Sequence, residues 1–297
     1  MRAVTRRTFL RVAAVASVGL GACPAALRAQ PRTIKVGLIE PVTGPMAEVG
    51  QDARLGGQLA VEAINAAGGV KSLGGAKIDL LLADSQTKPD VARLEAERLI
   101  AGGAQLLTGG FHSAHVATIA LLAQQRRVPY IIDISAADQP TANVAKSVRE
   151  GQQKVQYVYR IFPGSATFGR NAVRYMVDIF REAGVNPKRL VLLYSNDLFG
   201  KTQTESFLAA HKAANPSFDV VEVLPFPENA ADLSTEVTRA KAARPDVLAP
   251  ITRPATAILV LEEVAKRGSR RWASSVRARL ASTRRGRSSS SESGSST

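Results

Sequence analysis

Short apolar runs alternate with segments of helical periodicity from residue 33 onward. The first run, residues 34–39, has the length and the β-branched content of a buried strand. Apolar residues then recur at three- and four-residue spacing, which predicts an amphipathic helix that ends at Gly68: Leu55, Leu59, Ala63 and Ala66. This alternation is typical of a parallel sheet with helices on its faces.

The same alternation continues to about residue 150. Three further runs predict strands at 78–83, 104–108 and 128–132. A helix opens at Pro89, which the first helical turn tolerates, and another spans 113–126. These elements predict one α/β lobe, residues 30–150.

A second series follows the polar stretch at residues 151–153. It starts with a helix that carries Val173, Met176, Val177 and Phe180. Strands are predicted at 189–194, 218–224 and 246–251, followed by helices from Leu198, from Asp232 with Leu233 and Val237 inward, and one that carries Ile258, Leu261 and Ala265. Residues 151–268 thus form a second α/β lobe. Ligands of such sheets bind outside the carboxyl ends of the strands, so two facing lobes predict a binding cleft.

The first 29 residues have the pattern of an export signal. Arg6 and Arg7 form a twin-arginine motif, and a mild apolar run follows at residues 12–20. Cleavage after Ala29 is the favoured processing, and the alternative is a lipoprotein box that makes Cys23 a membrane anchor. Both predict a mature protein outside the cytoplasmic membrane.

The net charge of +14 does not indicate a nucleic-acid partner, because the ends of the chain hold most of it. Residues 1–30 carry +5, residues 269–297 carry +6, and everything between carries only +3. The last segment has eleven serines, seven arginines and no periodic apolar face, and it is predicted to be disordered. Its abrupt start favours a tail outside the original reading frame over a functional basic tail.

Several motifs in combination resemble the branched-chain amino-acid type of periplasmic binding protein. They stand at residues 34–45, 63–70, 83–85, 128–131, 197–200 and 232–234. The resemblance spans residues 33–268 and implies a two-lobed type I periplasmic binding protein fold. It further implies a monomer that delivers a small molecule to the membrane subunits of an ABC importer, and a chain whose C-terminal part is missing.

The resemblance also implies where the ligand binds. Ser113 matches the position of a hydroxyl that holds a ligand carboxylate, and the stretch at 134–136 matches one that supplies backbone groups. Phe199 stands where a tyrosine is common, and Ala255 stands where an acidic residue holds an ammonium group. The candidate ligand-binding residues are Phe111, His112, Ser113, Ile134, Ser135, Ala136, Tyr194, Phe199 and Arg253.

The residue types indicate an anionic ligand. The loop before the helix at 113–126 offers backbone amides and a helix dipole. Arg253, at the end of a strand, is a candidate clamp for a carboxylate, and the alternative is a solvated arginine. His112 and His115 with Asp84 have the residue types of a metal site, but capping or surface roles are favoured. We therefore predict neither a metal nor a cofactor.

The predicted function is capture of an amino acid or related small carboxylate in the periplasm for an ABC importer. An exported enzyme such as a hydrolase is the first alternative, although the chain has no GxSxG, GxxxxGK[ST], GxGxxG or HExxH motif. A sensory ligand-binding protein is the second alternative. It is disfavoured because no apolar span follows the signal.

Overall fold

The computed structural model describes residues 33–267. The predicted export motif with Arg6 and Arg7, Cys23, and the Ser/Arg-rich tail lie outside the described residues. The chain divides into two compact units, each described here by itself: a small one, Ala60–Asp79 with the described residues before Lys35, and a large one that holds the other described residues.

The small unit contains the last two turns of helix α2 (Ala47–Ala66), the 3-10 turn η1 (Lys71–Leu73) and the start of strand β2 (Ile78–Asp84). The Asn65 side chain ties the helix end to the strand: its Nδ2 donates to the carbonyl of Ile78, and its Oδ1 accepts from the amide of Ile78, both at 2.8 Å. Gly69 has φ +80°, and a Cβ there would lie 2.5 Å from two carbonyl oxygens. Only glycine therefore fits this turn.

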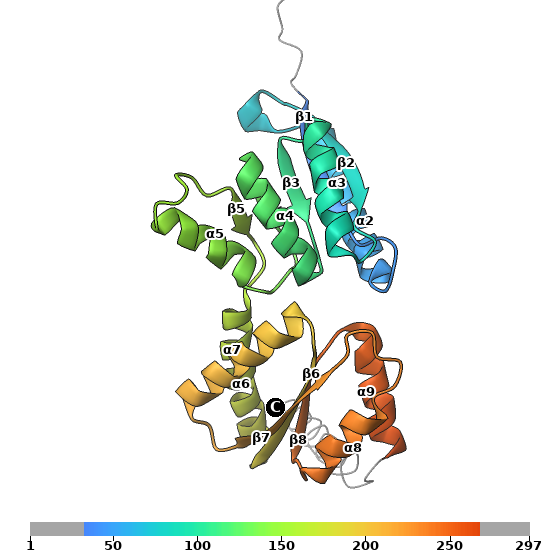
Figure 1. The fold of residues 1–297 in the computed structure, drawn as a ribbon, viewed down its shortest axis with the longest axis vertical. Coiled ribbons are helices and arrows are strands. Elements are labelled where there is room, and N and C mark those ends of the chain that lie inside the picture. The colour runs from blue at the N-terminus through green and yellow to red at the C-terminus, as the bar shows by residue number, and fades with distance from the viewer. Residues whose placement is uncertain (1–32, 268–297) are drawn as a thin grey trace, which may run out of the picture. The chain divides into compact units, whose positions relative to one another are not determined.

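Five parallel strands form the first sheet, in the order β2-β1-β3-β4-β5 (Figure 1). Besides β2, the strands are β1 (Ile34–Glu40), β3 (Leu106–Gly109), β4 (Tyr130–Ile132) and β5 (Val158–Arg160). The helices of this part are α2, α3 (Pro89–Ala101), α4 (Ser113–Arg126) and α5 (Gln139–Arg149). The predicted helix over 113–126 and the helix start at Pro89 are confirmed.

Helix α5 and strand β5 were missed by the sequence analysis. The helix buries only Pro140 and Val144, and the strand has three residues, so neither leaves a long periodic pattern. Strand β5 pairs with β4 although it follows residue 150 in the chain. The predicted lobe boundary at 150 stays a prediction.

Alternation along β1 directs side chains to the two faces of the sheet. Ile39 belongs to the core cluster that contains Leu99 of α3 and Ile119 of α4. Leu38 lies against α2 on the other face, where a Cβ at Gly57 would meet its side chain at 2.7 Å. Helices therefore cover both faces, as the pattern predicted.

The second sheet has three parallel strands in the order β7-β6-β8. Its strands are β6 (Arg189–Ser195), β7 (Asp219–Phe226) and β8 (Val247–Ile251), and its helices are α6 (Ser165–Glu182), α7 (Leu198–Ala214), α8 (Ser234–Ala242) and α9 (Pro254–Lys266). All three predicted strands and the helix start at Leu198 are confirmed to within two residues.

The central strand β6 shows why helices lie on both sides of this sheet. Leu190 and Leu192 pack in one core cluster with residues of α6 and α7. Val191 and Leu193 pack in another cluster with residues of α8 and α9. The strand is buried on both faces, so it is a continuous apolar run.

The apolar stripes of two predicted helices are exposed among the described residues. Leu55 and Leu59 of α2 are 55% and 56% exposed, and Ile258 and Leu261 of α9 are 57% and 66% exposed. Periodicity thus predicted the helices correctly, whereas burial of these stripes depends on what packs against them. Within 33–267, no helix combines the length and the apolarity needed to cross a bilayer.

Two helical glycines give a matched prediction. A Cβ at Gly169 of α6 would lie 2.4 Å from the carbonyl oxygen of Ser206 in α7, whereas a Cβ at Gly56 of α2 would meet nothing within 4 Å. We expect Gly169→Ala to lower the free energy of unfolding by about 1–3 kcal/mol, because the helices must separate. Gly56→Ala should raise it by up to about 1 kcal/mol. Urea denaturation measures both, and equal effects would contradict the close approach of α6 and α7.

Candidate functional site

The loop between β3 and α4 is shaped by two glycines. Gly109 and Gly110 have φ of +102° and +99°, which side chains rarely adopt. A Cβ at Gly109 would lie 2.4 Å from the carbonyl oxygen of Ile39, and a Cβ at Gly110 would lie 2.6 Å from the Tyr130 hydroxyl. The loop therefore turns tightly and sets the positions of Phe111 and His112, which follow it.

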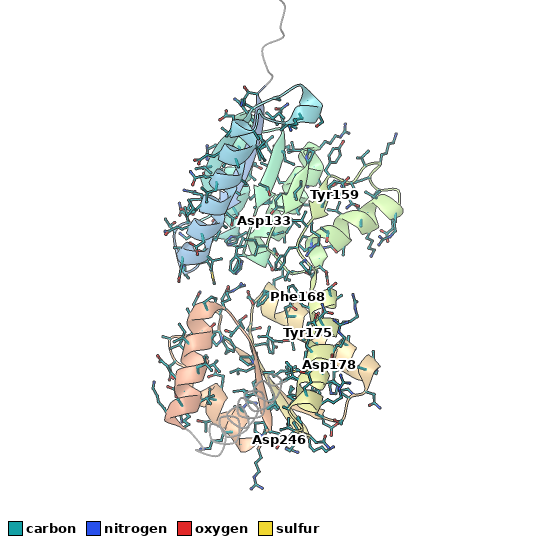
Figure 2. All side chains as sticks on the ribbon, turned by 180° about the vertical axis from the view of Figure 1, so that it is seen from behind. Asp133, Tyr159, Phe168, Tyr175, Asp178 and Asp246 are labelled. Atoms are coloured by element: carbon teal, nitrogen blue, oxygen red, sulfur yellow. The ribbon has the colours of Figure 1, made fainter. Side chains whose placement is uncertain are left out.

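A cavity of about 440 Å³ lies next to this loop. Its described lining comes from the loop, from the segments after β4 and after β5, from α6 and α7, and from the junction of β8 with α9. Five of the lining residues are phenylalanines: Phe111, Phe162, Phe168, Phe199 and Phe207. Figure 2 labels one of them, Phe168, on α6. Arg253 is the only charged residue among the described lining residues.

Arg253 is held from several directions and is only 6% exposed. Its Nε donates to Glu228 Oε1 at 3.1 Å, and its Nη2 donates to Asp197 Oδ2. The centre of the guanidinium lies 4.8 Å from the ring centroid of Phe199 and 5.5 Å from that of Phe111. The alternative of a solvated arginine is therefore wrong.

Asp197 is the fixed partner of this arginine. It caps α7, where its Oδ1 accepts from the amide of Gly200 and from the hydroxyl of Ser195, both at 2.8 Å. Burial raises the pKa of Asp197, but the charge of Arg253 and these hydrogen bonds outweigh it, so the pKa lies below its usual value. Asp197 is thus a carboxylate at neutral pH.

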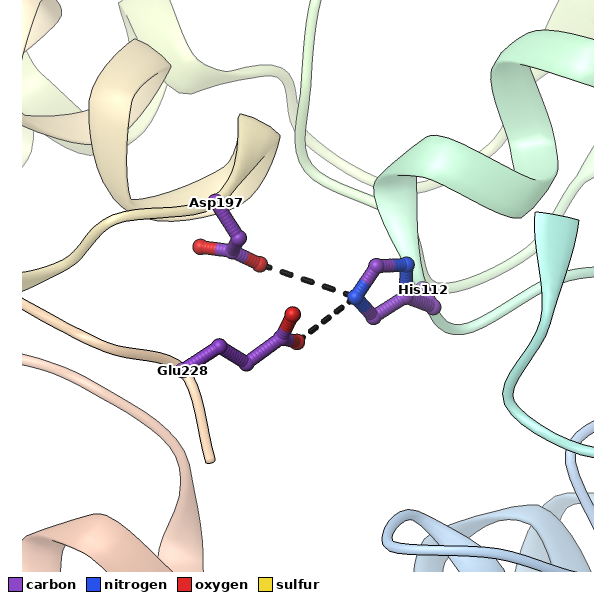
Figure 3. A group of neighbouring side chains, drawn as sticks. All are labelled: His112, Asp197 and Glu228. Atoms are coloured by element: carbon purple, nitrogen blue, oxygen red, sulfur yellow. Dashed lines mark hydrogen bonds and ion pairs between the residues drawn. The ribbon is translucent and has the colours of Figure 1, made fainter. Parts of the chain in front are cut away.

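His112 joins the same network from the loop after β3 (Figure 3). Its Nε2 lies 2.6 Å from Glu228 Oε1 and 3.7 Å from Asp197 Oδ2. The ring of His115 is 4.5 Å away, centroid to centroid. Burial, followed by the nearby charge of His112, lowers the pKa of His115 to about 4, so His115 is neutral at pH 7.

The donors of this network have the types found at metal sites. One atom each of His112, Asp197 and Glu228 lies within 4.8 Å of the others. The guanidinium of Arg253, however, donates to both carboxylates and already supplies the compensating positive charge. We therefore interpret the group as an ion-pair network. Asp84, considered with His112 in the sequence, instead accepts from the amides of Val42 and Gln86.

The structure brings most of the predicted ligand-binding residues together, and their role in binding stays a prediction. Five line the cavity: Phe111, Ile134, Ala136, Phe199 and Arg253. His112 contacts the network beside it. Ser113 and Ser135 are buried and share a hydrogen bond of 3.0 Å but are not among the lining residues. Tyr194 lies in β6, opposite Ile251, and does not line the cavity either.

Two observations add to the sequence analysis. His112 stands at the N-cap position of α4 without a side-chain hydrogen bond to the helix, and Ser113 has the first helical position. Glu228 was missed entirely and Asp197 was noted only within a motif. Asp197 had a sequence signal, an acidic residue before a helix, whereas Glu228 lies in a loop that no pattern marks.

The pair of buried hydroxyls allows a prediction on stability. Ser113→Ala leaves the Ser135 hydroxyl, which is 1% exposed as a residue, without its partner. We expect the free energy of unfolding to fall by about 1 kcal/mol, and the double variant with Ser135→Ala to lose less than the sum of the single variants. Chemical denaturation of all four proteins measures this. Strictly additive losses would contradict the hydrogen bond.

The fold agrees with the comparisons with known proteins. The chain belongs to the periplasmic binding protein family, which it matches over residues 33–277. It is 26% identical over 260 residues to the Leu/Ile/Val-binding protein homolog 8 of Brucella suis, an alignment that covers 85% of this chain and 60% of that protein. The chain thus spans about 60% of the length of the curated relatives it matches.

Solved structures show the same type I periplasmic binding protein fold. The Leu-, Ile-, Val-, Thr- and Ala-binding protein from Brucella ovis, in a closed conformation, aligns with a TM-score of 0.64 at 22% identity, covering 81% of this chain and 58% of that chain. An ABC transporter solute-binding protein from Rhodopseudomonas palustris BisB5, in complex with 3,4-dihydroxybenzoic acid, aligns with a TM-score of 0.61 at 23% identity, covering 80% and 59%.

Proposed function

We propose that the protein captures an amino acid or a related small carboxylate in the periplasm and presents it to the membrane subunits of an ABC importer. The cavity beside the loop after β3 is the binding site, and the protein acts as an exported monomer with lobes at 30–150 and 151–268. The observation that carries this function is a largely apolar cavity whose lining, within residues 33–267, has one charged residue, Arg253. Such a site selects by shape and fixes orientation through one polar anchor.

The family and its named members support a binding role. The curated relatives are named as Leu/Ile/Val-binding protein homologs, and one similar structure holds an aromatic carboxylate. The alternative of an exported hydrolase has less support, because His112 contacts Glu228 and no nucleophilic side chain is placed beside it among the described contacts of His112. Binding without chemical change is therefore the expected activity.

A bound ligand also affects conformation. Phe111 follows β3 of the first sheet, whereas Arg253 follows β8 of the second sheet, and both line the cavity. A ligand that contacts both residues binds most tightly to the conformation in which Phe111 and Arg253 are close together. Binding therefore shifts the population toward that conformation. An importer that recognises this conformation would distinguish loaded from empty protein.

The test is a thermal-shift and calorimetric screen of the purified chain against amino acids, short-chain carboxylates, aromatic carboxylates and amides. We expect one chemical class to raise the melting temperature, because ligand that binds only the native state stabilises it. Mass spectrometry of the recovered ligand should show no change. Conversion of the ligand would favour the enzyme, and a cooperative melt that no compound shifts would contradict the binding function.

A further inference from the structure

The wall of the cavity is rich in aromatic side chains. Five phenylalanines line it, and the rings of Phe162 and Phe168 pack at 5.5 Å with an interplanar angle of 41°. Phe111 and Phe199 also line the cavity, and both rings lie near the guanidinium of Arg253. Tilted and offset rings at such distances are the arrangement in which aromatic groups attract one another. An aromatic ligand therefore gains more here than a branched aliphatic one.

The polar anchor of the cavity suits a carboxylate. Arg253 uses Nε and Nη2 for Glu228 and Asp197, while Nη1 makes no hydrogen bond with any residue in 33–267. A guanidinium nitrogen whose N–H groups are not used by the protein pairs well with a carboxylate oxygen. Asp197 and Glu228 fix the guanidinium in place, so little side-chain freedom is lost when the ligand binds.

The part of the wall that the structure describes offers no charged partner to an ammonium group. The described lining contains no Asp or Glu, and its other polar side chains are those of Gln203 and Thr252. Asp197 and Glu228 lie outside the lining and already accept from Arg253, and Glu228 also contacts His112. An α-ammonium in the cavity would lose its water without gaining a charged partner, which is costly.

We propose that the ligand of this site is an aromatic monocarboxylate without an α-ammonium group, an inference that rests on the proposed binding function. One carboxylate pairs with Arg253, and the ring lies among the phenylalanines. A second carboxylate on the ligand is disfavoured, because the described lining offers it no second positive side chain. The site thus selects by ring, by charge and by the absence of a positive group.

Calorimetry with a matched ligand series tests each feature on the unaltered chain. The probes are 3-phenylpropanoate, its amide, L-phenylalanine, which adds only the α-ammonium, and hexanoate, which lacks the ring. We expect 3-phenylpropanoate to bind at least tenfold more tightly than each of the others. Equal or tighter binding of L-phenylalanine or L-leucine would overturn the inference while the binding function stands. If none of these probes nor any of the screened amino acids binds, both fail.

Variants locate the effect at the cavity. Arg253→Gln should weaken binding of 3-phenylpropanoate at least thirtyfold and leave binding of the amide unchanged. The matched control is Arg174→Gln, because Arg174 also lies 4.8 Å from an aromatic ring, that of Tyr175, but on the exposed surface of α6 (Figure 2 labels Tyr175). This control should retain full affinity.

A second variant keeps the test decisive if Arg253→Gln does not fold. Phe168→Leu removes one ring from the cavity at a residue that is 37% exposed, so the fold should tolerate it. We expect about fivefold weaker binding of 3-phenylpropanoate and an unchanged affinity for hexanoate. Full affinity for 3-phenylpropanoate in Phe168→Leu, or in a folded Arg253→Gln protein, would overturn the proposed site.

Discussion

Replacing Asp197 with alanine is expected to lower the free energy of unfolding by about 3–5 kcal/mol, because it leaves the buried guanidinium of Arg253 without its closest charged partner. The same change removes the cap of α7, since Asp197 accepts from the amide of Gly200. Asp197→Asn keeps an oxygen for this cap and loses only the charge. We therefore expect a smaller loss, about 2 kcal/mol, from Asn. Urea denaturation at pH 7 separates the two contributions.

The pH dependence of the Asp197 contribution follows from its lowered pKa. Its folded-state pKa lies below the usual 3.8, so the contribution is present above about pH 4 and is lost as the pH falls through the folded-state value. The difference between the original chain and Asp197→Asn should therefore shrink in acid. Asp232→Asn is the matched control, because Asp232 also precedes a helix and accepts from the amide of Ser234 but is exposed. If this control costs as much as Asp197→Asn, the ion pair with Arg253 is not the cause.

The sequence predicted secondary structure correctly in elements whose buried side chains recur at regular spacing. Strand β6 is buried on both faces and helix α4 buries eight residues, so their apolar patterns are unambiguous. Helix α5 and strand β5 were missed because they are short and bury few side chains. Their positions are fixed instead by long-range contacts, such as the hydrogen bonds that Arg160 donates to the carbonyls of Ser135 and Ala137.

The site was predictable only in part. Phe111 and Arg253 follow strands, and the rule that ligands bind at the carboxyl ends of parallel strands predicts their position in the cavity. The network of His112 with Glu228 joins residues 116 positions apart in the sequence. No local pattern encodes such a pairing, because only the packing of the chain brings these side chains together. The exposed apolar residues of α2 and α9 show the same limit, because periodicity predicts a helix but not which element packs against it.

Glu40→Gln is expected to stabilise the protein at alkaline pH. Glu40 is fully buried at the end of β1, beneath the glycine loop, and its Oε2 has no hydrogen-bond partner in the described structure. Burial, followed by the charge of nearby Asp133, raises the pKa of Glu40 to about 9. Figure 2 labels Asp133 after β4. A raised folded-state pKa means that the native state holds a proton which the unfolded chain releases above about pH 4.5.

The bound proton on Glu40 makes its full contribution to the free energy of unfolding below about pH 4.5. This contribution decreases as the pH rises from about 4.5 toward 9. Glutamine stays neutral in both states and its Oε1 can still accept from the amide of Gly110, as Glu40 Oε1 does at 3.3 Å. We expect little difference at pH 5 and a gain of about 2 kcal/mol at pH 8, less than the full linkage because the titration of Glu40 depends on the charge of Asp133.

Denaturation curves at pH 5, 6.5 and 8 measure the free energy of unfolding of the original chain and of Glu40→Gln. The control variant is Glu205→Gln. Glu205 is an exposed residue of α7, so its neutralisation should change the free energy of unfolding little at any of these pH values. A gain for Glu40→Gln that does not grow with pH would contradict a buried, protonated Glu40.

Glu40 accepts a hydrogen bond from the loop that leads to Phe111 and His112. If its role is to support this loop as a neutral acceptor, Glu40→Gln should also leave ligand affinity intact. Loss of affinity without loss of stability would contradict this supporting role.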